Sequence, residues 1–187
     1  MNNRGANVLI HREHSLLLHI DLQVKLAVAI HEMESVLTTN IWLTDIANHL
    51  TVPVIATLQY PAGLGLLLPE IASRVKEYNI TEKIHFSAIT NGQLQALPDF
   101  SHPQIILTGI ETHVCVLQTA MDLLSIGKEV FVVAEAVGSR RTSDRDLALE
   151  RMRQEGCKIV SREMVVFEWL REAGTEDFKK ISKNYVR

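Results

Sequence analysis

The chain of 187 residues has 19 basic and 22 acidic residues, a formal net charge of −3, and a hydrophobic content of 47%. This length suits one domain with a sizeable core, spanning residues 1–187. The slight negative charge and the lack of a basic run argue against a nucleic-acid partner.

The first fifteen residues, MNNRGANVLIHREHS, lack the apolar core of a signal peptide. No apolar run approaches the roughly 20 residues that cross a bilayer. We therefore expect a cytoplasmic protein without a membrane partner. The two cysteines, Cys115 and Cys157, are too few for a disulfide framework, and no CxxC pair suggests a metal site.

The first half of the chain alternates short apolar runs with segments of helical period. SLLLHID (15–21) predicts a buried strand, and the apolar spacing over 31–50 predicts a helix. PVIATLQ (53–59) predicts a second strand that a proline opens. ITEKIHF (80–86) is typical of either a short strand or an extended loop. A short helix that ends near Pro98 is expected within 91–100.

The second half continues the alternation. Strands are predicted at 103–110, 129–136 and 157–161. The stripe of apolar residues after Cys115 predicts a helix that stops at Gly127, a natural C-terminal residue. A further helix is expected over 143–156, capped by Ser143 or Asp144. Two closing helices are expected at 163–173 and 175–183.

Strands that alternate with helices predict a three-layer α/β domain around a mostly parallel sheet. Ligands of such sheets bind at the carboxyl ends of the strands. The predicted strand exits carry an acid, an amide with an aromatic ring, a base and a thiol. These residues are Asp21, Gln59 with Tyr60, Lys83 and Cys115. They would converge if the four strands are neighbours.

Cys115 stands where the stretch GIETHVCVLQTA (109–120) turns from a strand into a helix. A thiol with a pKa of about 8.5 becomes a nucleophile beside a base, a cation or a helix N-terminus. Thr112 is a plausible N-cap for such a helix, and free N–H groups in its first turn would stabilise an oxyanion. The competing interpretation is a small side chain buried in the core.

The chain resembles the isochorismatase-like cysteine hydrolases, a superfamily that also contains nicotinamidases and N-carbamoylsarcosine amidase. The resemblance covers almost the whole domain and leaves residues 1–13 as an N-terminal extension. LLLHIDLQ and GIETHVCVLQTAMDLLSIGKEVFVVAEAVGSR carry it. QYPAGLG, SREMVVFEWL and DFKKIS are similar to the isochorismatase-domain-containing subgroup.

The resemblance implies roles for five groups. Asp21 would be the general base, Lys83 the orienting cation and Cys115 the nucleophile. The peptide bond Ile110–Glu111 would be cis, and the backbone N–H groups of Glu111 and Cys115 would form the oxyanion hole. The side chains that would line the pocket are Gln23, Gln59, Tyr60, Phe86 and Ile110.

The implied reaction is hydrolysis of a small amide or related C–N compound through a thioester intermediate. Nicotinamidases bind a metal through an Asp-x-His arrangement after the second strand. TLQYPAGLGLLLPE (57–70) contains neither residue type, so we expect no metal and no cofactor. The apolar part of this segment would line a substrate pocket or a subunit contact.

Several alternatives remain open on the sequence alone. The chain could be a catalytically silent binding or scaffold protein on the same fold. Lys76 is a rival to Lys83, and His113 invites a pairing with Cys115, although a spacing of two residues on a helix turns side chains apart. Cys157 is expected to serve packing only. We also expect a homo-oligomer, because the family usually associates.

Overall fold

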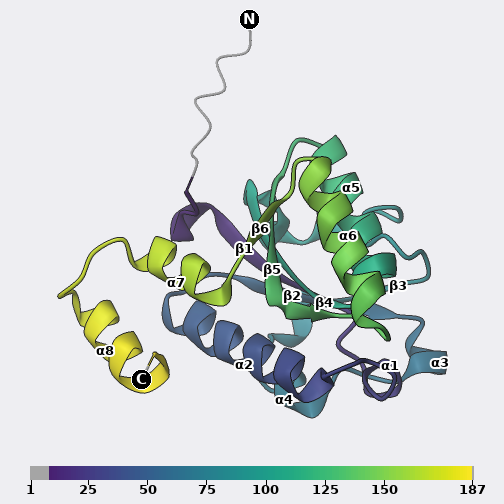
Figure 1. Cartoon of the computed structure of the whole chain (residues 1–187), viewed down its shortest axis with the longest axis horizontal. Helices are drawn as coiled ribbons and strands as arrows, with labels where there is room; N and C mark the ends of the chain where they lie inside the picture. The colour runs from purple at the N-terminus through teal and green to yellow at the C-terminus, as the bar shows by residue number, and fades with distance from the viewer. Residues whose placement is uncertain (1–8, 187) are drawn as a thin grey trace, which may run out of the picture.

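Six strands form a single parallel sheet in the order β3-β2-β1-β4-β5-β6 in the computed structural model, which describes residues 9–186 (Figure 1). The strands are β1 (Ser15–Ile20), β2 (Val54–Gln59), β3 (Ile80–Lys83), β4 (Gln104–Ile110), β5 (Glu129–Gly138) and β6 (Lys158–Val160). Each interior strand is an apolar run of the sequence, as expected for a sheet that is covered on both faces.

Helices connect the strands and cover both faces of the sheet. The α-helices are α1 (Val24–Ala27), α2 (Met33–His49), α3 (Pro61–Leu64), α4 (Pro69–Ala72), α5 (Leu117–Ser125), α6 (Thr142–Gln154), α7 (Arg162–Leu170) and α8 (Glu176–Tyr185). Short 3₁₀ turns are η1 (Arg12–His14), η2 (Glu77–Asn79), η3 (Leu94–Ala96) and η4 (Pro98–Ser101), and η5 (Thr112–Val116) is a π-helical turn.

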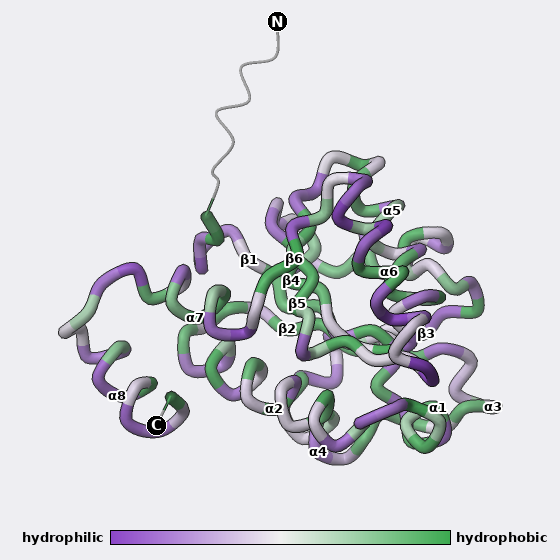
Figure 2. The backbone as a smooth tube through the Cα atoms, viewed as in Figure 1, coloured by the Kyte–Doolittle hydropathy of each residue, from purple (hydrophilic) through white to green (hydrophobic). Residues whose placement is uncertain are grey.

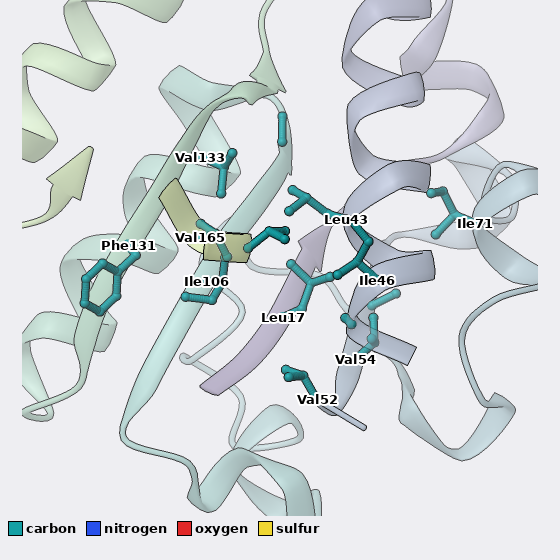
Figure 3. Close-up of a cluster of buried hydrophobic side chains, with 14 of the residues drawn as sticks. Leu17, Leu43, Ile46, Val52, Val54, Ile71, Ile106, Phe131, Val133 and Val165 are labelled. Carbon is teal, nitrogen blue, oxygen red and sulfur yellow. The ribbon is translucent and has the colours of Figure 1, made fainter. Parts of the chain in front are cut away.

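The core consists of two layers of side chains, one on each face of the sheet. Leu17 of β1 joins residues of α2, α4 and α7 in one cluster, part of which is drawn in Figure 3. Leu16 and Leu18 point to the opposite face and join residues of α5 and α6. The hydrophobic parts of the tube gather along the central strands, whereas α6 is largely hydrophilic (Figure 2).

The order of the strands places a topological switch point between β1 and β4. The chain runs outward from β1 through β2 to β3, and then returns to β4 on the other side of β1. In an open α/β sheet the crevice at the carboxyl ends of such a pair is where ligands bind. Asp21 follows β1 and Cys115 follows β4, so both lie at this crevice.

The predicted three-layer α/β fold is confirmed, and the sheet is parallel at every strand pairing that the structure describes. The segment 80–86 divides into β3 and a loop. The short helix expected within 91–100 is the 3₁₀ helix η3, and a second 3₁₀ helix, η4, begins at Pro98. Helix α6 begins earlier than expected: Arg141 is its N-cap, without a side-chain cap.

Of the N-terminal extension expected over residues 1–13, residues 1–8 lie outside the described part of the chain. Ile10 is fully buried, and its N–H donates to Glu168 of α7 at 2.6 Å. Among residues 9–186 no helix is long and apolar enough to cross a membrane.

Candidate active site

Asp21 is fully buried at the end of β1, in a left-handed backbone conformation with φ of 51°. Asp tolerates this region better than most residues because its short side chain bonds locally. Thr57 of β2 accepts the Asp21 N–H at 3.2 Å and donates its hydroxyl to Oδ1 at 2.6 Å. The neighbouring strand therefore fixes one oxygen of this carboxylate.

Lys83 ends β3 and reaches across β2 to the other carboxylate oxygen. Its ammonium lies 2.6 Å from Oδ2 of Asp21 and 2.7 Å from Oε1 of Gln59. A third N–H donates to the carbonyl of Phe86 at 3.1 Å. Because the lysine side chain is 2% exposed and that of Asp21 is 0% exposed, the two charges form a buried pair.

Gln23 and Gln59 hold the surrounding loops rather than facing open space. The Gln23 amide accepts the Gln59 N–H at 2.8 Å and donates to the carbonyls of Gln59 and Gly65. Gln59 donates to the carbonyl of Ile84 at 2.6 Å while it accepts from Lys83. Both amides therefore act on the site through the residues that they fix.

The nucleophile turn, defined as residues 111–116, links β4 to α5. The peptide bond Ile110–Glu111 is cis. The Glu111 carbonyl then accepts the N–H of Val114 at 3.1 Å and of Val116 at 3.2 Å, which produces the wide π-helical turn. Cys115 thus lies in this turn, ahead of α5, and not in the first turn of an α-helix. The Thr112 hydroxyl is not an N-cap: it is buried and has no hydrogen-bond partner among residues 9–186.

The Cys115 thiol lies beside both charges of the Asp21–Lys83 pair. Burial and, after it, the Asp21 carboxylate raise the pKa of the thiol to about 12, and the Lys83 ammonium opposes the rise. The resting residue is therefore the neutral thiol, with a carboxylate at hand to receive its proton.

Cys157 provides the contrast. Burial raises the pKa of its thiol to about 12 as well, and the nearby charge that contributes is Glu155. It packs in the core cluster beneath α5 and α6. The two thiols therefore differ in their neighbours and not in their burial.

The other predicted pocket residues fall into two groups. Tyr60 and Phe86 are each 53% exposed and border the strand exits together with exposed Leu66 and Ile84. Ile110 is fully buried among the residues that pack against α2, on the sheet face opposite to Cys115. The structure thus does not place the Ile110 side chain at an accessible pocket.

His113 turns away from the thiol, as its spacing suggests. Its Nδ1 lies 3.0 Å from the hydroxyl of Ser139, at the end of β5. Lys76 is far from this network, beside Tyr78. In the described part of the chain, no three His, Cys, Asp or Glu side chains gather in a way that could hold a metal ion.

Two residues near the site were missed by sequence reasoning. Thr57 lies between apolar residues inside a strand. Nothing in its position along the sequence distinguishes it from a core residue. Arg140 was not among the residues expected at the site, yet it pairs with Glu111 at 2.9 Å. Its position directly after a predicted strand exit was the available signal.

Comparisons with known proteins agree with the observed fold. The Isochorismatase domain model matches residues 15–164. Isochorismatase family protein 1B of Dictyostelium discoideum is 39% identical over 175 residues, which cover 90% of this chain and 84% of the relative. The structure of MAR1 ribonuclease from Caenorhabditis elegans has 35% identity and a TM-score of 0.88, covering 96% of this chain and 93% of that one.

A third similar protein is YcaC from Pseudomonas aeruginosa, solved with hexane-2,5-diol and covalent acrylamide. It has 25% identity and a TM-score of 0.86, with 97% of this chain and 93% of that chain covered. The match of the domain model covers well over half of the sequence, and the sheet with its helices has the isochorismatase-like hydrolase fold. The chain belongs to the Isochorismatase domain family.

Proposed function

We propose that the chain is a metal-independent cysteine hydrolase that cleaves a small amide or a related C–N compound through a thioester intermediate. Asp21, Lys83 and Cys115 would be its catalytic residues. The observation that carries the proposal is the contact of one thiol with a buried carboxylate–ammonium pair at the switch point of the sheet. A buried charge pair is costly to desolvate, and this cost favours a functional reason for the pair.

The reaction would start from the neutral thiol. Asp21 accepts the proton from Sγ of Cys115 as the sulfur attacks the carbonyl carbon, and the carbonyl oxygen becomes an oxyanion. The N–H groups of Glu111 and Cys115 would stabilise that oxyanion. The C–N bond then breaks, Asp21 protonates the departing amine, and a thioester on Cys115 remains.

The second half-reaction would regenerate the enzyme. Asp21 takes a proton from water, and the resulting hydroxide attacks the thioester carbon. The S–C bond breaks, the thiolate recovers the proton held by Asp21, and the carboxylic acid leaves. The hydrogen bonds from the Lys83 ammonium already engage four protein oxygens. Lys83 would therefore act on the charge and orientation of Asp21 and not by binding substrate.

The test is a screen of amides, ureas and esters with mass spectrometry of the protein. We expect an acyl adduct on Cys115, and kcat lowered by about 10²–10⁴-fold in Asp21→Asn. Cys115→Ser should lose the adduct, whereas the matched variant Cys157→Ser should keep activity. The covalent acrylamide in the YcaC structure makes acrylamide a suitable first probe.

The alternative is a binding or scaffold protein that uses the same fold without turnover. Exposed Tyr60, Leu66, Ile84 and Phe86 would then be its contact surface. No adduct and no turnover across the screen, together with a partner retained in pull-down, would favour it. Labelled RNA belongs in the same screen because the Caenorhabditis elegans relative is described as a ribonuclease; the net charge of −3 argues against RNA binding here.

A further inference from the structure

A bidentate ion pair between Arg140 and Glu111 connects the nucleophile turn to the segment after β5. The Arg140 guanidinium donates from Nε to Oε2 of Glu111 and from Nη2 to Oε1, both at 2.9 Å. A fork of two parallel hydrogen bonds fixes the mutual orientation of the groups, which a single contact does not.

The exposure of the two partners is unequal. The Glu111 side chain is 9% exposed and that of Arg140 is 64% exposed. A carboxylate with so little access to water needs a partner to remain charged in place. Since solvent screens the attraction on the arginine side, the pair contributes little to the stability of the fold. What it supplies is the orientation of Glu111.

Other contacts restrain the same residue and its neighbours. The Glu111 carbonyl accepts the N–H groups of Val114 and Val116. The His113 ring bonds the hydroxyl of Ser139, the residue that precedes Arg140. The nucleophile turn is thus held from within by its own N–H groups and from outside by two consecutive residues of the segment after β5.

We propose that Arg140 is a positioning residue for the oxyanion site. Its fork on the Glu111 carboxylate holds the Glu111 peptide so that the N–H faces the carbonyl oxygen that becomes charged. The inference rests on the proposed function, in which this N–H is one of the oxyanion donors. Since Glu111 occupies the guanidinium fork, Arg140 does not require an anionic group on the substrate.

Two reagents separate positioning of the oxyanion site from general damage. p-Nitrophenyl acetate is a neutral ester whose acylation of Cys115 passes through an oxyanion and releases p-nitrophenolate. Iodoacetamide alkylates the same sulfur by displacing iodide from a saturated carbon, and no oxyanion forms. The rate of each reaction at Cys115 is measured by mass spectrometry, alongside the melting temperature.

We expect Arg140→Gln to slow acylation about 10- to 100-fold, because a misplaced donor loses much of its effect. Alkylation and the melting temperature should stay unchanged. Arg140→Lys should recover only part of the acylation rate, since lysine supplies the charge without the fork. The double variant Glu111→Gln/Arg140→Gln should acylate no more slowly than Arg140→Gln alone. Arg141→Gln, a change at the adjacent exposed arginine, is the matched control.

Three results would overturn the inference. Arg140→Gln could acylate at the wild-type rate, or acylation and alkylation could fall together. Failure of the wild-type protein to form an acetyl adduct at Cys115 would instead overturn the proposed function, and the positioning role with it. The last outcome is recognised in the wild-type protein alone, so the two failures are distinguishable.

Discussion

The Cys115 thiol lies beside two opposite charges, and these decide how its ionisation should respond to substitution. The Asp21 carboxylate raises the pKa of the thiol and the Lys83 ammonium lowers it. Asp21→Asn should therefore lower the pKa of Cys115, and Lys83→Met should raise it. The measurement is the pH dependence of iodoacetamide alkylation at each cysteine, since only the thiolate reacts.

Turnover should respond differently from alkylation. Asp21→Asn should lose activity even though its thiol ionises more readily, because no carboxyl group remains to donate a proton to the leaving group. Cys157 is an internal control whose alkylation should be the same in all variants. Equal pH profiles for Cys115 in wild-type and Asp21→Asn protein would contradict the placement of the carboxylate beside the thiol.

His19 predicts a pH dependence of stability. Burial lowers its pKa to about 4, against the opposing hydrogen bond to Asn40. The neutral ring is held between Thr108 at 2.7 Å and Thr44 at 2.8 Å. As the pH falls below about 6.5, His19 is protonated in the unfolded chain. In the folded chain it stays neutral until the pH approaches about 4.

The free energy of unfolding should thus be fully maintained above about pH 6.5. It should fall by on the order of 3 kcal/mol as the pH drops to about 4. Urea titrations across this range, with His19→Gln as the comparison, measure the effect. The variant should be less stable at neutral pH but show a shallower slope; parallel slopes would exclude His19 as the source.

At the scale of elements, the approach of β4 to β1 depends on one glycine. Gly109 has φ of 109°, and a Cβ there would overlap the carbonyl oxygen of Ile20. Gly109→Ala should destabilise the protein by more than about 3 kcal/mol, since backbone strain and a steric clash add. It should also displace the nucleophile turn, which begins two residues later.

Gly127→Ala is the matched control for this prediction. Gly127 also has a positive φ, of 84°, but a Cβ there meets no atom within 4 Å. This change should cost only about 1 kcal/mol from backbone strain. Denaturant unfolding of both variants measures the difference, and equal losses would show that contact with Ile20 does not matter.

At the scale of the whole molecule, we predict a homo-oligomer. Helix α8 packs its apolar side within the same chain: Ile181 is fully buried, and Phe178 packs against the core. Helix α7 instead exposes Met164 and Phe167, and further apolar residues are exposed around the strand exits. Light scattering that gives a mass of 21.0 kDa at all concentrations would contradict the prediction.

Much of the fold could be predicted because apolar periodicity is local. All six strands and the helices α2, α5, α6, α7 and α8 correspond to predicted segments, with shifts of a few residues at their ends. The short helices α1, α3 and α4 were missed, since four residues contain too few turns to display a period. The short helix expected within 91–100 is present as a 3₁₀ helix, and the second 3₁₀ helix after it was not predicted.

The sequence by itself determined the layers of the fold, the strand exits, and the chemical types found there: Asp21, Lys83 and Cys115. The resemblance supplied their expected roles. These features depend on the order of residues along the chain, and local patterns record that order directly. The family assignment has the same basis, because it follows from residues matched in order.

Only the tertiary structure decided which of these groups meet. The strand order brings β3, β2, β1 and β4 side by side, so residues 62 positions apart form the Asp21–Lys83 pair. It also assigned Thr57 to the carboxylate and Arg140 to Glu111, and it turned His113 and Ile110 away from the thiol. Contacts of this kind depend on strand register and side-chain direction, which arise from packing across the whole sheet.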